Sequence, residues 1–186
     1  MTADLEGHIA WGPPRRPGQS GDPARVTATF DLMSAVLEER PLEDVLTLIA
    51  SHALAMAGAR LAFIALPEEN DANVLRIDLA LGHDSDRIRG HSVRRGRSMI
   101  GRVFSTRRAL STRIAVDQTV NGLPAGPALL LPLETGEATR GVLAVIGRPG
   151  DLPLSASVTR NLSLFASMAA TLVELAEERR ATDRIA

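Results

Sequence analysis

The feature that most constrains this chain is the order of short segments between residues 94 and 147. A glycine turn leads into a short amphipathic pattern, RSMIGRVFSTRR, and a strand-like run, ALSTRIAVD, follows. After a short gap come two apolar runs, PALLLPLE and TRGVLAVIG, separated by a polar turn. These spacings predict a short helix, a strand and then an antiparallel hairpin.

The remaining segments extend the same pattern. Residues 60–66 are apolar and residues 73–81 alternate, which predicts a second hairpin. Apolar residues recur at helical spacing in 25–40 (Phe30, Met33 and Val36 or Leu37) and again in 41–58, and a longer helical pattern follows Ser155. The order predicts an α+β fold built on an antiparallel sheet.

The chain divides into three parts on composition. Residues 1–24 are rich in Pro and Gly, which predicts a disordered or loosely attached leader. Residues 25–176 carry the periodic segments of one domain, whose core spans about 41–176. Residues 177–186 are polar and helical, and we expect them to project as a stalk towards a downstream effector.

Composition excludes several kinds of chemistry. The 186 residues contain no Cys, and all 21 basic residues are Arg, so thiol and lysine nucleophiles are absent. A net charge of -1 and 3% aromatics disfavour a nucleic-acid partner. With neither a secretory signal nor a membrane-spanning apolar run, we expect a cytoplasmic protein that does not insert into membranes.

Three segments together resemble the GAF family of small-molecule-sensing domains. They are GRSMIGRVFSTRRALSTRIAVD, PLETGEATRGVLAVI and LPLSASVTRNLSLFASMAATLVELA, and the resemblance covers about residues 41–176. It implies a central antiparallel sheet of about six strands. Terminal helices would pack on one face, and a short lid helix and loops on the other.

A narrower resemblance lies at the end of the chain. The segment ERRATDRIA is similar to the helix before the phospho-acceptor box of actinobacterial GAF-containing sensor histidine kinases, and the chain stops at Ala186, before any such His. This implies a non-catalytic input domain of a two-component kinase. The alternatives are a ligand-free dimerisation or interaction module, and a GAF input to a transcription or antitermination regulator.

The resemblance also implies a ligand pocket between the sheet and its lid. The ligand is unknown, and the alternative is that the same side chains simply fill the core. The pocket candidates are Phe63, Leu79, His91, Met99, Val103, Phe104, Asp117, Leu123 and Leu129.

Cofactors of related domains are disfavoured here. The loop QTVNGLPAGP lacks a His, Tyr or Met that could ligate haem iron, and bilin attachment usually needs Cys. No group of His, Asp and Glu has the spacing of metal ligands. Residues 87–116 contain nine Arg and no acidic residue, which indicates either a site for an anionic partner or a solvated basic face.

The closing helical pattern carries two apolar lines. One should pack on the sheet, and the other is free for the same helix of a second copy, which predicts a homodimer through the terminal helices. A monomer is the alternative. The candidate interface residues are Leu164, Met168, Leu172 and Leu175.

Overall fold

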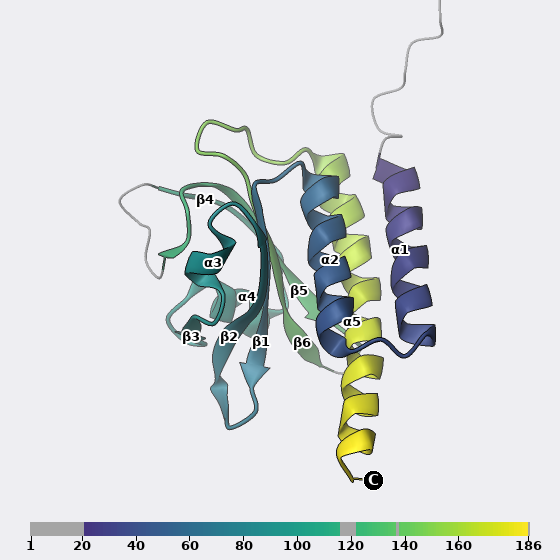
Figure 1. Ribbon diagram of the computed structural model, residues 1–186. Coiled ribbons are helices and arrows are strands. Elements are labelled where there is room, and N and C mark those ends of the chain that lie inside the picture. Colours follow the sequence, from purple (N-terminus) through teal and green to yellow (C-terminus); the bar gives the residue numbers. More distant parts are fainter. Residues whose placement is uncertain (1–20, 116–121, 137, 186) are drawn as a thin grey trace, which may run out of the picture.

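The structure, a computed structural model, describes residues 21–115, 122–136 and 138–185. One sheet lies between two unequal helical layers (Figure 1). The strands are β1 (Leu61–Glu68), β2 (Asp71–Gly82), β3 (Ser92–Arg94), β4 (Leu110–Ile114), β5 (Gly126–Glu134) and β6 (Thr139–Ile146). The helices are α1 (Gly21–Leu37), α2 (Leu42–Ala57), α3 (Ser85–Ile88), α4 (Met99–Thr106) and α5 (Ala156–Ile185).

The sheet has the order β3-β2-β1-β6-β5-β4, and every neighbouring pair is antiparallel. Helices α2 and α5 cover one face, with α1 outside them, while α3 and α4 cover the other face (Figure 1). This confirms the predicted α+β class, the number of strands and the two unequal layers. The short edge strand β3 is the one strand to which the sequence assigned no range.

The helix ends follow the expected capping chemistry. Gly58 ends α2 in the left-handed conformation, with φ of 58°. The Ser98 hydroxyl accepts a hydrogen bond from the Gly101 amide at 2.9 Å at the start of α4, and Ser155 accepts one from Val158 at 3.3 Å before α5. Local sequence therefore fixes these boundaries.

Helix α1 starts at Gly21, four residues before the predicted start. Of its predicted apolar stripe, Val36 is buried but the largest side chains are not. Phe30 is 70% exposed and Met33 49% exposed, whereas Leu32 is completely buried. The buried side consists of Ala28, Leu32, Ala35 and Val36, where α1 packs on α2 and α5. Residues 1–20 of the predicted leader lie outside the described part of the chain.

A β-bulge in β2 divides the buried side chains between the two faces of the sheet. Ile64 pairs with Leu79, but the next residue of β1, Ala65, pairs with Ile77, so Asp78 is the extra residue. One extra residue inverts the alternation of side chains beyond it. Consequently Ile77 faces α3 and α4, whereas Leu79 faces the long helices.

Candidate functional site

The lid core is the cluster of side chains buried between the sheet and the elements that cover this face. These elements are α3, α4 and the residues around Leu123, before β5. Every element on that side contributes at least one apolar residue. Its members include Phe63, Ile77, Ile88, Ile100, Val103, Phe104, Ile114, Leu123, Leu130 and Ile146. The sheet supplies the floor and the short helices supply the roof.

Five predicted pocket residues meet in this lid core. Phe63 lies in β1, Val103 and Phe104 lie in α4, and Leu123 follows the loop after β4. Met99, at the start of α4, packs against the same cluster while remaining partly exposed. The helical spacing of the α4 residues was therefore sufficient to identify its inward face.

Leu79 and Leu129 were wrongly assigned to this pocket. Both belong to the core on the opposite face, beneath α2 and α5. The bulge at Asp78 turns Leu79 away from the lid. In β5 the run ALLLPL is apolar on both sides, so the sequence could not distinguish Leu129 from Leu130, which is the residue that faces the lid.

Two pocket candidates remain, His91 and Asp117. His91 is exposed, and it lies so close to the loop that a Cβ on Gly122 would be 3.5 Å from its Cε1 atom. Asp117 lies outside the described residues. Within those residues, no three His, Asp or Glu side chains are placed to hold a metal ion together.

The glycine of the amphipathic pattern has a packing role. A Cβ on Gly101 would lie 2.0 Å from the carbonyl oxygen of Arg95, so α4 can approach the preceding loop only without a side chain there. The Arg95 guanidinium lies 4.7 Å from the centre of the Phe104 ring and donates to the Ser105 hydroxyl at 2.8 Å. Both contacts join α4 to the loop that follows β3.

The side chains at the centre of the lid core are almost completely buried. Phe63 is 0% exposed, and Ile100 and Val103 are each 1% exposed. A side chain without accessible area adjoins no space that admits water. Two surface hollows adjoin the described helices: one of about 460 Å³ lies between α4 and β4, and one of about 480 Å³ lies between α5 and the α1–α2 turn.

Strand β4 connects the lid core to the loop that leads into α5. Ile114 is buried in the lid core. Its neighbour Arg113 points the other way and donates two hydrogen bonds, at 2.9 Å to the carbonyl oxygen of Pro149 and at 2.8 Å to that of Asp151. Adjacent residues of one strand therefore contact the candidate input side and the loop that precedes the output helix.

The candidate dimer residues do not share one environment. Leu172 is 8% exposed and belongs to the domain core, so its assignment to an intermolecular surface was wrong. Met168 packs partly against the same core. Leu164 and Leu175 are 50% and 45% exposed, so they remain available on the surface of α5.

Charged contacts join the later turns of α5 to the domain, next to the segment 177–186 that the sequence predicted to project as a helical stalk. Arg140 of β6 pairs with Glu174 and lies 3.9 Å from Glu177. Arg179 donates to the Val36 carbonyl at 3.0 Å, at the end of α1. Burial raises the pKa of Glu177 against the opposing effect of Arg140, and Glu174 adds to the rise.

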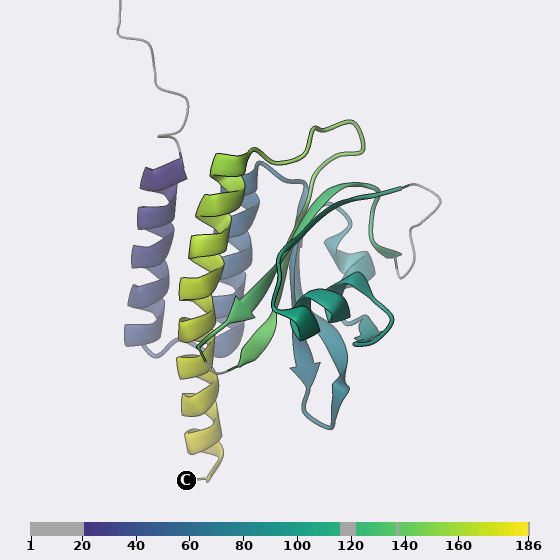
Figure 2. The same ribbon diagram turned by 180° about the vertical axis from the view of Figure 1, so that it is seen from behind.

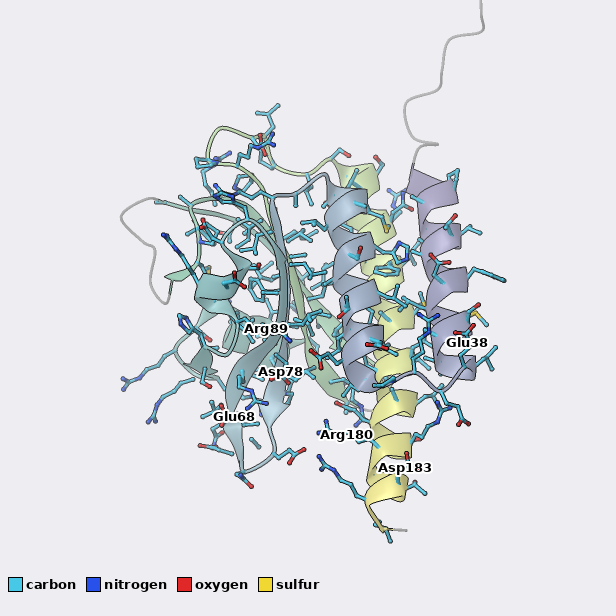
Figure 3. All side chains as sticks on the ribbon, viewed as in Figure 1. Glu38, Glu68, Asp78, Arg89, Arg180 and Asp183 are labelled. Atoms are coloured by element: carbon cyan, nitrogen blue, oxygen red, sulfur yellow. The ribbon has the colours of Figure 1, made fainter. Side chains whose placement is uncertain are left out.

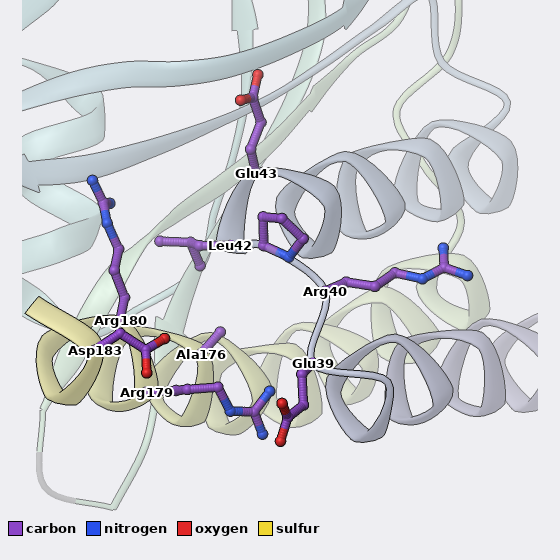
Figure 4. A pocket seen from close by; sticks show the side chains of 9 residues that line it. Glu39, Arg40, Leu42, Glu43, Ala176, Arg179, Arg180 and Asp183 are labelled. Carbon is purple, nitrogen blue, oxygen red and sulfur yellow. The ribbon is translucent and has the colours of Figure 1, made fainter. Parts of the chain in front are cut away.

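Figure 4 shows the cleft of about 480 Å³ that this arrangement leaves between α5 and the α1–α2 turn. Arg179 and Glu39 extend toward each other across it. Further along the helix, Arg184 lies 3.2 Å from Glu69 in the β1–β2 turn, and Arg180 and Asp183 extend from the same segment (Figure 3). Charged contacts therefore hold the last turns of α5.

A family model described as "GAF domain" matches residues 42–175. The chain belongs to the GAF domain family. The GAF-B domain of DevS from Mycobacterium smegmatis is similar at 26% identity with a TM-score of 0.66, covering 76% of this chain and 98% of that one. A second structure of a DevS GAF domain from the same organism, the second GAF domain, is also 26% identical with a TM-score of 0.67, covering 76% and 99%.

A more distant structure shows the same fold. Residues 122 to 287 of a methyl-accepting chemotaxis protein share 17% identity with a TM-score of 0.66, over 83% of this chain and 99% of that one. Within the described residues, no helix is both long and apolar enough to cross a membrane.

Proposed function

We propose that this chain is a regulatory, non-catalytic GAF input domain that acts in the cytoplasm and controls an effector joined to α5. The effector that best fits the terminal segment ERRATDRIA is a two-component histidine kinase. Occupancy at the lid would change the position of α5, and the effector would respond to that change.

The observation that carries this proposal is the continuity of α5. It is a single helix of 30 residues, Ala156–Ile185. Its first part is buried against the sheet, and its last turns extend past the body of the domain (Figure 1). A helix that is continuous from core to exit passes on a rotation or shift with little loss.

The test is a fusion of the chain, through Ala186, to the transmitter of a histidine kinase with a measurable phosphorylation rate. Inserting one to seven alanines after Arg184 should change the rate with the periodicity of a helix, because each residue rotates the exit by about 100°. A rate that is indifferent to the insertions, or that falls steadily with their number, would remove the proposed transmission.

The proposed signalling unit is a homodimer, and its interface includes α1. Val26, Phe30, Met33 and Leu37 are all about half exposed or more, at 61%, 70%, 49% and 78%. Their spacing of four, three and four residues forms an apolar seam typical of paired helices. Leu164 and Leu175 of α5 add to the exposed apolar surface.

Charge substitution tests this dimer directly. Phe30→Glu with Met33→Glu should convert a dimer into a monomer in analytical ultracentrifugation while the circular dichroism spectrum is kept. Leu152→Glu is the matched control, because Leu152 is 84% exposed outside the helices and should leave the dimer intact. A wild-type chain that sediments as a monomer at high concentration would refute the dimer.

The buried lid core favours a second candidate, a ligand-free dimerisation or interaction module. Phe63, Ile100 and Val103 are almost completely buried at its centre, whereas small-molecule sites usually have volumes of about 300 Å³ or more. Native mass spectrometry of the purified chain distinguishes the two candidates. A co-purified small molecule supports sensing, and its consistent absence with an active fusion supports the interaction module.

A further inference from the structure

The outer edge of β4 presents backbone groups that the proposed signalling role does not use. The Gly147 amide donates to the carbonyl of Pro127 at 2.8 Å, so the backbone carbonyl of Pro127 faces the β6 side of β5. Its partner in β4 is Arg113. Because these groups alternate in direction along an antiparallel strand, those of Arg113 and Ser111 point away from the sheet.

This edge is open within the described residues. β4 is the last strand of the sheet, and no described residue forms a backbone hydrogen bond with the outward groups of Ser111 or Arg113. Both residues are exposed. In Figure 2 the dark green strand that follows α4 runs along the rim of the sheet. An open edge of this kind accepts an added strand.

A basic cleft adjoins the start of the same strand. It is lined by Arg102, Val103, Thr106, Arg108, Ala109 and Leu110, with a volume of about 460 Å³. Within the described residues the guanidinium groups of Arg102 and Arg108 make no ion pair or hydrogen bond, and both side chains are exposed. Two uncompensated cations therefore lie where an added strand would end.

The charge around the edge selects its occupant. The nine Arg of residues 87–116, without a single carboxylate, would repel the same edge of a second copy. A nucleic acid lacks the backbone amides that an open strand edge pairs with. Phe104, the aromatic residue of α4, is covered by Arg95 and cannot stack on a base.

We propose that β4 binds an extended acidic peptide segment of a partner protein as an additional strand. The peptide backbone pairs with the outward groups of Ser111 and Arg113. Its carboxylates lie at Arg102 and Arg108, where charge-assisted hydrogen bonds form. The proposed contacts are backbone groups of β4 and the exposed guanidinium groups of Arg102 and Arg108, so the interaction does not require a small-molecule ligand in the lid core.

The probe for the test is a fluorescein-labelled, acetylated octapeptide of alternating glutamate and threonine, titrated with the whole chain at low salt. We expect a saturable rise in fluorescence anisotropy that weakens as salt is added. A lysine–threonine peptide should not bind, and neither should the acidic peptide after N-methylation of alternate amides. In wild-type protein, the amides of Ser111 and Arg113 should gain protection from hydrogen exchange.

Matched variants separate the site from general charge. Arg102→Glu with Arg108→Glu should weaken binding by roughly tenfold or more, because it replaces two attractions by two repulsions. Arg94→Glu with Arg97→Glu makes the same charge change before α4 and should weaken binding by less than about threefold. Ser111→Pro removes one outward amide and should weaken binding by about tenfold.

Three outcomes would overturn the proposal. The first is the absence of binding by the acidic peptide, and the second is an equal loss in the two double-charge variants. The third is binding of the N-methylated peptide or of single-stranded DNA as tight as that of the acidic peptide, which would indicate a general polyanion surface. Amide protection in the wild-type chain decides the strand pairing even if Ser111→Pro fails to fold.

Discussion

The two faces of the sheet are covered by structures of very different size. On one face lie α1, α2 and α5, with 17, 16 and 30 residues. The other is covered by α3 and α4, with four and eight residues, together with loops. Long helices release their contacts only in large cooperative steps, whereas short helices and loops open locally. The difference makes the lid face the natural place for input and the helical face the place for output.

The largest effect that tests this comparison is expected at Phe165, which is 0% exposed in the helical core. Phe165→Ala should lower the free energy of unfolding by about 3–5 kcal/mol, because it leaves a cavity that long helices cannot close. Urea denaturation measures the loss. Phe104→Ala, in the lid at 8% exposure, is the counterpart and should cost less. An equal or larger loss at Phe104 would contradict the comparison.

The next effect concerns the approach of α4 to the loop before it. Gly101→Ala should lower the free energy of unfolding by about 1–3 kcal/mol, because its Cβ would meet the Arg95 carbonyl at 2.0 Å and force α4 outward. Native-state hydrogen exchange should accelerate in α4 but remain unchanged in α5. Gly96→Ala is the control, since nothing lies within 4 Å of its Cβ. Acceleration throughout α5 would show that the lid does not open separately.

The same contrast explains how far the sequence could predict the structure. Helix α4 was located correctly, with Val103 and Phe104 facing inward, because one side of it is polar and the pattern is unambiguous. Strands β1, β5 and β6 are buried on both faces, so their continuous apolar runs do not indicate which side chains face the lid. The bulge at Asp78, which turns Leu79 away from the lid, depends on pairing with β1 and leaves no local signal.

Packing against other helices was similarly hidden. Phe30 is the largest side chain of α1 and was expected on its apolar stripe, yet it is exposed while Ala28 is buried. Helices that pack closely need small side chains at the contact. A sequence interpretation based on the largest apolar residues therefore chooses the wrong positions. Leu172 is the opposite case, a residue that was expected on the surface and is buried. Helix α5 contacts the sheet and two helices, so more than one line of its residues is buried.

A smaller effect distinguishes the charged contacts near the exit of α5 from those elsewhere. Arg140→Gln should lower the free energy of unfolding by about 1 kcal/mol, because it leaves Glu174 and Glu177 without their shared cation in a half-buried position. Arg76→Gln removes the exposed pair with Asp78 and should change stability by less than about 0.5 kcal/mol. Equal losses in urea denaturation would show that the contacts of Arg140 with α5 stabilise the domain no more than an exposed ion pair does.

The smallest effect is a pH dependence at Glu177, where burial raises the carboxyl pKa above its usual 4.5. A raised folded-state pKa means that folding favours the protonated form. The stability from this group is thus fully present below about pH 4.5 and is lost as the pH rises through the folded-state pKa. Glu177→Gln, which mimics the protonated form, should therefore stabilise the chain at pH 7 by at most about 1 kcal/mol and should match wild type near pH 4.

Urea denaturation between pH 4 and pH 8 measures this difference, with Glu178→Gln as the control on the neighbouring, exposed position. A Glu177→Gln chain that is less stable than wild type at pH 7 would mean that the attraction of Arg140 outweighs the cost of burial. The contact with β6 would then be a stabilising ion pair. If the gain appears instead, the exit of α5 is held under a small electrostatic penalty, and its position is easier to shift than that of the helical core beneath it.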